Sequence, residues 1–255
     1  MLLAIDIGNT NAVLGIFDGD RLVDHLRIES RSGSTADEYA ALLAVMLQQR
    51  NVELNSIDAA IIGSVVPALT EVFDRVCCRL FNAPPIVVGP GVRTGMSMQI
   101  ENPREVGADR IVNAVAAFAR AQGPAIVVDF GTATTFDVVS HKGEYMGGVI
   151  VPGVGISADA LAERTAKLPR VEIARPKSVI GRTTVQAIQS GLVFGYVSLI
   201  EGLVRRISEH LDAPPRVIGT GGLAPLIAAE TTAINEVVEF LTLDGLRIVW
   251  ERNGD

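Results

Sequence analysis

The chain has 255 residues, of which 48% are hydrophobic and 20% are charged, and its formal net charge at pH 7 is −7. This length fits one large domain or two of ordinary size, and the negative charge argues against a nucleic-acid-binding surface. The best candidate for a membrane helix, residues 191–200, has about half of the ~20 apolar residues required, and the N-terminus lacks signal-peptide features, so we expect a cytoplasmic protein without membrane contact.

The first half of the chain is predicted to contain five strands and two helices. The strands are expected at 2–7, 12–18, 21–28, 59–64 and 84–89, and the helices at 37–50 and 67–81. The first three strands read as a meander with hairpin signals, because a tight turn at 18–20 separates two of them. Thr35 is a candidate N-cap for the first helix, and Pro67 opens the second.

The second half is predicted to repeat this order after a glycine-rich loop at 90–108. A connecting helix should begin near Pro103 or Gly107 and end at Ala121. Strands follow at 125–129, 133–139, 144–151, 216–222 and 236–239, with helices from about 153, at 184–211, after 226 and at 242–251. The sequence therefore predicts an α/β protein made of two similar halves.

Two similar segments, 4–17 and 125–138, carry the chemistry of this repeat. In each, an apolar strand reaches an aspartate (Asp6 or Asp129), passes a glycine turn and continues as a second strand. Such a turn can offer backbone N–H groups to phosphate while the carboxylate holds a hydrated cation. The sequence predicts two related domains, 1–115 and 116–255, that face each other across a nucleotide cleft.

Four motifs in this order resemble the type III pantothenate kinase family. They are DIGNT at 6–10, VGADR at 106–110, DFGTATTFD at 129–137 and GGVIVPG at 147–153. That family belongs to the superfamily of actin, the sugar and acetate kinases and the Hsp70 ATPase domain. The resemblance implies two RNase H-like, actin-like ATPase domains with mixed sheets. It implies that 1–115 holds the phosphate loop, and that 116–255 holds the second turn and the dimerisation surface of a homodimer.

The first turn is the expected phosphate site. Gly8 would let the backbone approach a phosphate, Asn9 and Thr10 would add donors, and Asp6 would hold Mg²⁺ through water. A plain hairpin turn with a capping aspartate is the alternative, whereas a dinucleotide fingerprint is excluded because a strand, not a helix, follows the turn. The expected ATP-binding residues are Asp6, Ile7, Gly8, Asn9, Thr10, Asn11, Ala12, Val13 and Thr132.

The resemblance implies that Asp109 is the general base and that 107–110 binds pantothenate. A carboxylate within reach of a primary hydroxyl can accept its proton during phosphoryl transfer, and Arg110 could pair with a substrate carboxylate. A capping aspartate beside a surface arginine is the alternative. The expected substrate-binding residues are Ile100, Gly107, Ala108, Asp109, Arg110 and Thr184, and for Thr184 an ordinary helix N-cap is equally open.

The resemblance also implies a monovalent cation, K⁺ or NH₄⁺, at Asp129, and an ATP contact by Thr132. A carboxylate with carbonyl and hydroxyl oxygens suits a hard cation. Asp137 has no assigned chemistry and reads as structural. The turn at 219–222 could lie against the nucleotide base. One departure from the family pattern is Gln99-Ile100, where relatives often carry an aromatic residue.

The remaining candidate side chains form no site. Cys77 and Cys78 are adjacent, a spacing that fits neither a disulfide framework nor a zinc site. His25, His141 and His210 are isolated, so they predict neither a metal site nor a catalytic triad.

The sequence therefore predicts an enzyme that phosphorylates pantothenate with ATP and Mg²⁺, the first step toward coenzyme A. Two alternatives stay open. One is a kinase for another small hydroxylated acid, which the change at Gln99-Ile100 allows. The other is a nucleotide-binding accessory protein that influences transcription, although such a protein should have lost Asp6, Asp109 or Asp129, and all three are present.

Overall fold

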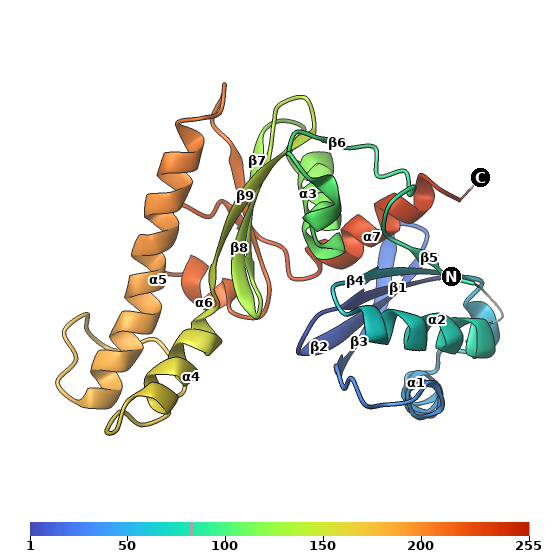
Figure 1. Cartoon of the computed structure of the whole chain (residues 1–255), viewed down its shortest axis with the longest axis horizontal. Coiled ribbons are helices and arrows are strands. Elements are labelled where there is room, and N and C mark those ends of the chain that lie inside the picture. Colours follow the sequence, from blue (N-terminus) through green and yellow to red (C-terminus); the bar gives the residue numbers. More distant parts are fainter. Residues whose placement is uncertain (82–83, 255) are drawn as a thin grey trace. The chain divides into compact units, whose positions relative to one another are not determined.

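The computed structural model describes residues 1–81 and 84–254, and the chain divides into two compact units (Figure 1). Unit 1 contains Met1–Gly95, Glu101–Ala116 and Thr242–Asp255, and unit 2 contains Met96–Ile100 and Ala117–Leu241. The main boundary therefore lies inside one helix, α3 (Ala108–Ala121). This helix connects the two halves, as its position in the sequence predicts.

Unit 1 is built on a five-stranded mixed sheet with the strand order β3-β2-β1-β4-β5. Its strands are β1 (Leu2–Ile7), β2 (Asn11–Asp18), β3 (Arg21–Glu29), β4 (Ala59–Ser64) and β5 (Ile86–Val87). β1, β2 and β3 form an antiparallel meander, whereas β4 runs parallel to β1 and β5 runs parallel to β4. The predicted meander is therefore confirmed.

Helices cover both faces of this sheet. They are α1 (Ala36–Gln49), α2 (Pro67–Phe81), α7 (Leu241–Glu251) and the first part of α3, with short 3-10 turns at Leu54–Ser56 and Pro103–Glu105. The predicted cap of α1 is present as a capping box: Thr35 Oγ1 accepts from the N–H of Glu38, whose carboxylate accepts from the N–H of Thr35. α1 and α2 pack through Tyr39 and Phe73, whose ring centroids are 4.8 Å apart.

The C-terminal helix α7 packs on the opposite face of the sheet of unit 1. A Cβ atom on Gly15 would lie 2.7 Å from Leu243 Cδ1, and one on Gly63 would lie 3.0 Å from Leu246 Cδ2. The two glycines therefore leave room for the leucines of α7. This packing explains why residues from 242 onward group with unit 1, whereas the sequence places them in a second domain at 116–255.

Unit 2 repeats the architecture with a six-stranded sheet in the order β11-β10-β7-β8-β9-β6. Its strands are β6 (Ser97–Met98), β7 (Ala125–Phe130), β8 (Ala133–Val139), β9 (Glu144–Pro152), β10 (Arg216–Thr220) and β11 (Glu236–Val237). β7, β8 and β9 are an antiparallel meander, and β10 and β11 run parallel to β7, as β4 and β5 do to β1 in unit 1. The predicted fold of two similar halves with mixed sheets is confirmed.

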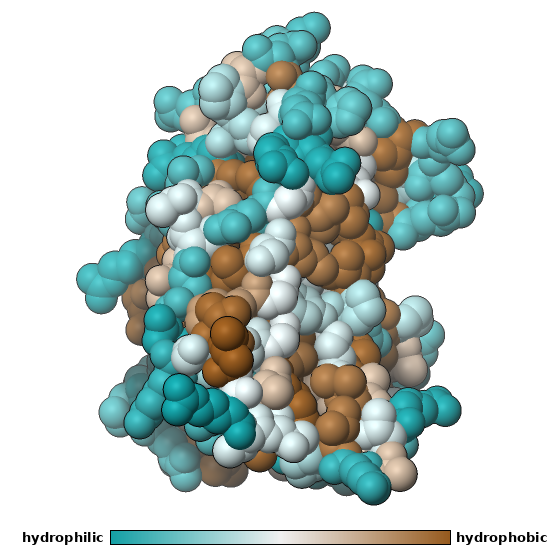
Figure 2. All heavy atoms as spheres, turned by 90° about the vertical axis from the view of Figure 1, so that its left-hand side faces the viewer, coloured by the Kyte–Doolittle hydropathy of each residue, from teal (hydrophilic) through white to brown (hydrophobic). Residues whose placement is uncertain are grey.

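The helices of unit 2 are α4 (Val154–Arg164), α5 (Thr184–Ser208) and α6 (Ala224–Ala228). α5 is long and apolar enough to cross a membrane by length and composition alone, whereas the apolar run predicted from the sequence covers only residues 191–200. It is instead the core helix of unit 2, because Val193 and Ile200 are fully buried with Val128 and Phe136 of the sheet. Figure 2 looks onto the side that carries α5 and shows apolar surface interrupted by polar side chains.

The other differences from the predicted elements lie at their ends. β5 is limited to Ile86–Val87, where it pairs with β4, and residues 82–83 lie outside the described residues. The connecting helix begins at Ala108, after a separate 3-10 turn. The loop 90–108 contains β6, which joins unit 2 because it pairs with β9. α5 ends at Ser208, β10 at Thr220 and β11 at Val237, whereas α6 starts at Ala224, two residues before Leu226.

Candidate functional site

The first turn, between β1 and β2, holds the predicted phosphate-binding residues of unit 1. Gly8 N donates to Asn11 O at 3.0 Å, and Ser30 braces the turn by donating its hydroxyl to Gly8 O at 2.7 Å. Asn9 and Thr10 are exposed, so their side chains are accessible to a ligand. Ile7 and Ala12 are fully buried in the core, so they can offer only backbone groups to a ligand. The sequence alone did not show which of the predicted residues would contact a ligand through the backbone and which through the side chain.

Asp6 is the only predicted metal-binding residue in this turn. It is partly buried at the carboxyl end of β1. Among the described residues, no group of three or more His, Cys, Asp or Glu side chains could enclose a metal ion. Mg²⁺ typically keeps several waters and is held by one or two carboxylates together with substrate phosphates. A single carboxylate beside a turn that is predicted to bind phosphate fits that pattern, so the residues present fit Mg²⁺ bound together with ATP.

Asp109 lies in the first turn of α3, and the structure brings its segment to the same edge of the sheet as Asp6. Val65, which directly follows β4, donates its N–H to Ile7 O at 3.1 Å. A Cβ atom on Gly107 would lie only 3.0 Å from Val65 Cγ1. The segment that carries Asp109 therefore packs beside the carboxyl ends of β1 and β4, the edge of an open α/β sheet where ligands usually bind.

The environment of Asp109 changes its acidity. Burial raises the pKa of its carboxyl group above the ordinary value of 3.8, while a backbone hydrogen bond from Arg110 and the positive charge of that residue lower it in part. Oδ1 of Asp109 accepts the Arg110 N–H at 2.8 Å. The first turn of a helix favours an anion. The carboxylate is thus more basic than an ordinary aspartate, as a proton acceptor should be.

The second turn, between β7 and β8, holds Asp129 in unit 2. A Cβ atom on Gly221 would lie 2.8 Å from Asp129 Oδ1 and 2.7 Å from Phe130 O, and Gly221 has a φ of 88°. A Cβ atom on Gly153 would lie 2.2 Å from Thr132 O. Both glycines therefore let backbone pack directly on this turn. The sequence predicted that 219–222 would lie against the nucleotide base, and it assigned no role to Gly153. A glycine that directly follows a strand often marks a close approach of backbone, so the position of Gly153 after its strand was a signal of this packing.

The oxygen chemistry of the second turn fits a cation. The carboxylate of Asp129 lies with backbone carbonyl oxygens of Phe130, Gly131 and Thr132 in one turn that crosses from β7 to β8. Hard cations take oxygen ligands of this kind. Thr132 is exposed, so its side chain can reach a ligand.

The two other predicted substrate residues of unit 2 are placed as follows. Ile100 is partly buried, and its Cγ2 would lie 3.4 Å from a Cβ atom on Gly147. Thr184 is exposed in the first turn of α5. The N-cap of this helix is Thr183, whose hydroxyl accepts from Gln186 N at 3.2 Å. The alternative that Thr184 is the cap is therefore wrong, and its hydroxyl has no capping role.

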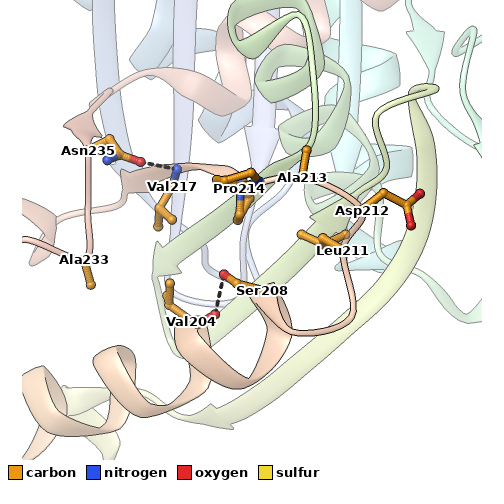
Figure 3. Close-up of a pocket in the computed structure, with 10 residues that line it drawn as sticks. Val204, Ser208, Leu211, Asp212, Ala213, Pro214, Val217, Ala233 and Asn235 are labelled. Atoms are coloured by element: carbon orange, nitrogen blue, oxygen red, sulfur yellow. Dashed lines mark hydrogen bonds between the residues drawn. The ribbon is translucent and has the colours of Figure 1, made fainter.

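A pocket of about 470 Å³ lies at the opposite end of β10 from Gly221 (Figure 3). It is lined by Val204, Ser208, Leu211, Asp212, Ala213, Pro214, Pro215, Val217, Ala233 and Asn235. Two hydrogen bonds join groups of this pocket and are drawn as dashed lines in Figure 3. Ser208 Oγ donates to Val204 O, and Asn235 Oδ1 accepts from Val217 N. No predicted site residue lines this pocket, so it is separate from the two turns.

Comparison with known proteins identifies the family. The model of the type III pantothenate kinase family matches residues 2–206. A protein named type III pantothenate kinase, from Anaeromyxobacter sp. (strain K), is 55% identical over 253 residues, which cover 99% of this chain and 100% of the relative.

Solved structures share the fold at low sequence identity. One is a protein from Campylobacter jejuni assigned to the Baf family of transcriptional activators, with a TM-score of 0.59 and 18% identity, covering 99% of this chain and 98% of that chain. Another is a protein from Sinorhizobium meliloti assigned as a 2-dehydro-3-deoxygalactonokinase, with a TM-score of 0.55 and 14% identity, covering 100% and 96%. These likenesses show that the chain shares the fold of these two proteins.

Proposed function

The chain belongs to the type III pantothenate kinase family, and we propose that it transfers the γ-phosphoryl group of ATP to the primary hydroxyl of pantothenate. The product is 4′-phosphopantothenate, on the route to coenzyme A. The observation that carries this proposal is the 55% identity to a named pantothenate kinase across 99% of the chain. The placement of Asp109 at the sheet edge that holds Asp6 supports it.

Asp109 is the proposed general base. As the hydroxyl oxygen of pantothenate attacks phosphorus, its proton moves to the carboxylate of Asp109. The raised pKa of this carboxyl group supports the role, since burial makes the carboxylate a better proton acceptor. Arg110, with Gly107 and Ala108, is proposed to orient the substrate, and Arg110 is suited to pair with its carboxylate.

The first turn is proposed to bind the phosphates of ATP. Backbone groups from Ile7 to Val13 and the exposed side chains of Asn9 and Thr10 are suited to this role, and Thr132 is proposed as a further ATP contact. Mg²⁺, held with ATP by Asp6 through water, would neutralise charge on the phosphates.

The second turn is proposed to hold a monovalent cation, K⁺ or NH₄⁺, at Asp129. The support is the oxygen-only chemistry of the turn and the close approach of Gly221 to the carboxylate. Ile100 and Thr184 are proposed to contact pantothenate. The exposure of Thr184 and its freedom from capping support that role.

We further propose that the protein is a cytoplasmic homodimer. Five exposed apolar side chains lie in the stretch from α4 to the first turn of α5, and they are Ile156, Leu161, Val179, Ile180 and Val185. Their number in this stretch supports an interface, since exposed apolar patches mark protein contacts. The cytoplasmic location is supported by α5, whose apolar side chains pack in the core of unit 2.

A substrate screen tests the proposed reaction. The protein is incubated with ATP, Mg²⁺, K⁺ and either pantothenate or other small hydroxylated acids and sugars, and phosphorylated products are identified by mass spectrometry. We expect 4′-phosphopantothenate as the main product. Phosphorylation of another acid in its place would favour the alternative that the change at Gln99-Ile100 leaves open, and nucleotide binding without any product would favour an accessory protein.

A further inference from the structure

Ser30 bonds to both sides of the first turn, although it is not among the predicted site residues. It directly follows β3 and is partly buried. Its hydroxyl donates to Gly8 O at 2.7 Å, and its backbone N–H donates to Thr10 O at 2.9 Å. Asn9 is the tip of the turn, between Gly8 and Thr10. A single residue at the end of β3 therefore holds the carbonyl groups on both sides of this tip.

These two bonds set the direction of the peptide groups in the turn. The peptide bonds here are trans, and in a trans peptide the carbonyl oxygen and the N–H of the next residue point in opposite directions. Because the Gly8 oxygen points toward Ser30, the N–H of Asn9 points away from it. The Thr10 oxygen directs the N–H of Asn11 in the same way. Both N–H groups therefore point away from Ser30.

The N–H of Asn9 is open to a ligand. Asn9 is exposed, and across residues 1–81 and 84–254 no hydrogen bond occupies its N–H. An N–H group that points out of a tight turn suits a phosphate oxygen. Rotation of the peptide between Gly8 and Asn9 would replace this N–H with a carbonyl oxygen, which repels phosphate. Glycine permits such a rotation readily, so the turn needs a group that prevents it.

Ser30 is itself held in place from α1. The hydroxyl of Tyr39 donates to Glu29 O at 3.0 Å and accepts from the N–H of Arg31 at 2.8 Å. It therefore fixes the backbone on both sides of Ser30. Tyr39 is 3% exposed, and its ring packs against Phe73 of α2 in the core of unit 1. The core thus supports the turn through Tyr39 and then through Ser30.

We propose that Ser30 is a positioning residue of the phosphate-binding turn, which it holds with the N–H of Asn9 directed toward ATP, and that Tyr39 anchors Ser30 to the core. This inference rests on the proposed function of the first turn. Ser30 acts through the turn and not on the nucleotide, because its hydroxyl and its N–H both donate to carbonyl groups of the turn. A hydroxyl has only one proton to donate.

Three substitutions of Ser30 isolate its hydroxyl group. Ser30→Ala removes the bond to Gly8 O and keeps the backbone N–H that bonds to Thr10 O. Ser30→Thr keeps a hydroxyl, and Ser30→Val has the shape of threonine without one, so these two variants differ in the hydrogen bond alone. Ser56→Ala is the matched control. Ser56 is also partly buried in unit 1, and its hydroxyl donates to a backbone carbonyl, Glu53 O, at 2.6 Å.

Two readouts are measured for each variant. The first needs no turnover: the Kd of a non-hydrolysable ATP analogue with Mg²⁺, obtained from the rise in Tm as the analogue concentration increases. The second is the KM for ATP, compared with the KM for pantothenate. We expect Ser30→Ala and Ser30→Val to raise the Kd and the KM for ATP about three- to tenfold, the fold-change that corresponds to one typical hydrogen bond. The KM for pantothenate should stay unchanged.

The other variants separate this role from a purely structural one. Ser30→Thr should bind the analogue as the wild type does, because its hydroxyl can still donate to Gly8 O. Ser56→Ala loses a hydrogen bond of the same kind, so it should lower Tm without changing the Kd. Tyr39→Phe should raise the Kd, because it releases the backbone beside Ser30.

The outcomes that overturn the inference are distinct from failure of the proposed function. A wild-type Kd in Ser30→Val, or equal rises in Ser30→Val and Ser30→Thr, would overturn the role of Ser30 and leave the proposed reaction intact. A wild-type Kd in Tyr39→Phe would overturn the role of Tyr39. A wild-type protein that binds no ATP analogue would contradict the proposed function of the first turn, and this inference with it.

Discussion

Oδ1 of Asp109 accepts a hydrogen bond from the backbone N–H of Arg110, 2.8 Å away, in the first turn of α3. This bond and the charge of Arg110 favour the ionised carboxylate, whereas burial opposes it, and burial is the larger effect on the pKa. The carboxylate is therefore held in place by its own helix while its affinity for a proton is increased. This combination is expected of a general base.

Gly107→Ala should displace this base. A Cβ atom at this position would lie 2.4 Å from Asp109 Oδ1 and 3.0 Å from Val65 Cγ1, so the carboxylate must move. Because a displacement of about 1 Å can cost roughly 100-fold in rate, we expect kcat to fall by about that factor. Steady-state kinetics measure the effect. Gly33→Ala is the control, since nothing lies within 4 Å of its Cβ position, and equal rates for both variants would refute the steric effect.

Asp109→Asn should stabilise the protein at neutral pH. The folded-state pKa of Asp109 is raised, so its titration contributes stability below the unfolded pKa, and this contribution is lost as pH rises through the folded pKa. At pH 7, well above the ordinary pKa of aspartate, the native protein therefore bears the free-energy cost of burying this titratable group, which the amide removes. Thermal denaturation should give a higher Tm for the variant at pH 7 and a smaller difference near pH 4, about the ordinary pKa of aspartate.

Asp20→Asn is the control for this prediction, because Asp20 is exposed in the turn between β2 and β3. It should change Tm little, and equally at both pH values. A lower Tm for Asp109→Asn at pH 7 would show that the ionised carboxylate stabilises the fold, which is the opposite of what its burial predicts.

The two adjacent cysteines should differ sharply in reactivity. Cys77 is buried, and burial raises the pKa of its thiol to about 12, whereas Cys78 is exposed. The thiolate is the reactive form. Iodoacetamide at pH 8 should therefore add one group to the native protein, at Cys78, as located by mass spectrometry. Cys78→Ser should remove the labelling, and modification of Cys77 in the native state would be inconsistent with its burial.

Ile180→Glu should dissociate the proposed homodimer. Ile180 is 81% exposed, in the segment where exposed apolar side chains concentrate, and a buried unpaired charge at an interface is costly. Light scattering should show the mass of one chain for the variant and of two for the wild type, with lower activity in the variant. Val45→Glu, at an exposed position of α1, should leave the mass unchanged. A wild-type monomer with full activity would disprove the homodimer.

The sequence predicted features that depend on local chemistry. The sequence predicted the N-cap at Thr35, the two strand–turn–strand repeats and the helix that joins the halves, and all of these follow from patterns within a few turns of chain. Packing decides that Ile7 and Ala12 are buried. The exact backbone geometry at the start of α5 decides that its N-cap is Thr183 and not Thr184. Those features were visible only in the folded chain.

Long-range pairing accounts for the larger differences. α7 joins unit 1 because Gly15 and Gly63, far away in sequence, leave space for its leucines, and β6 joins unit 2 because two residues pair with β9. The contact between Tyr145 and Asp137 depends on a one-residue bulge, which moves a side chain to the opposite face. A hydrophobic pattern carries none of this information, so Asp137 gave no sequence signal beyond its charge.

Pantothenate phosphorylation with Asp109 as the base is tested most directly by ADP release from ATP in the wild type and in Asp109→Asn, with Mg²⁺ and K⁺, in the presence and absence of pantothenate. We predict release that requires pantothenate and falls by about 10²–10⁴-fold in the variant, the usual contribution of a general base. Circular dichroism at equal concentration checks that the variant is folded. ATP turnover that is indifferent to pantothenate would contradict the proposed reaction, and a variant as active as the wild type would contradict the role of Asp109.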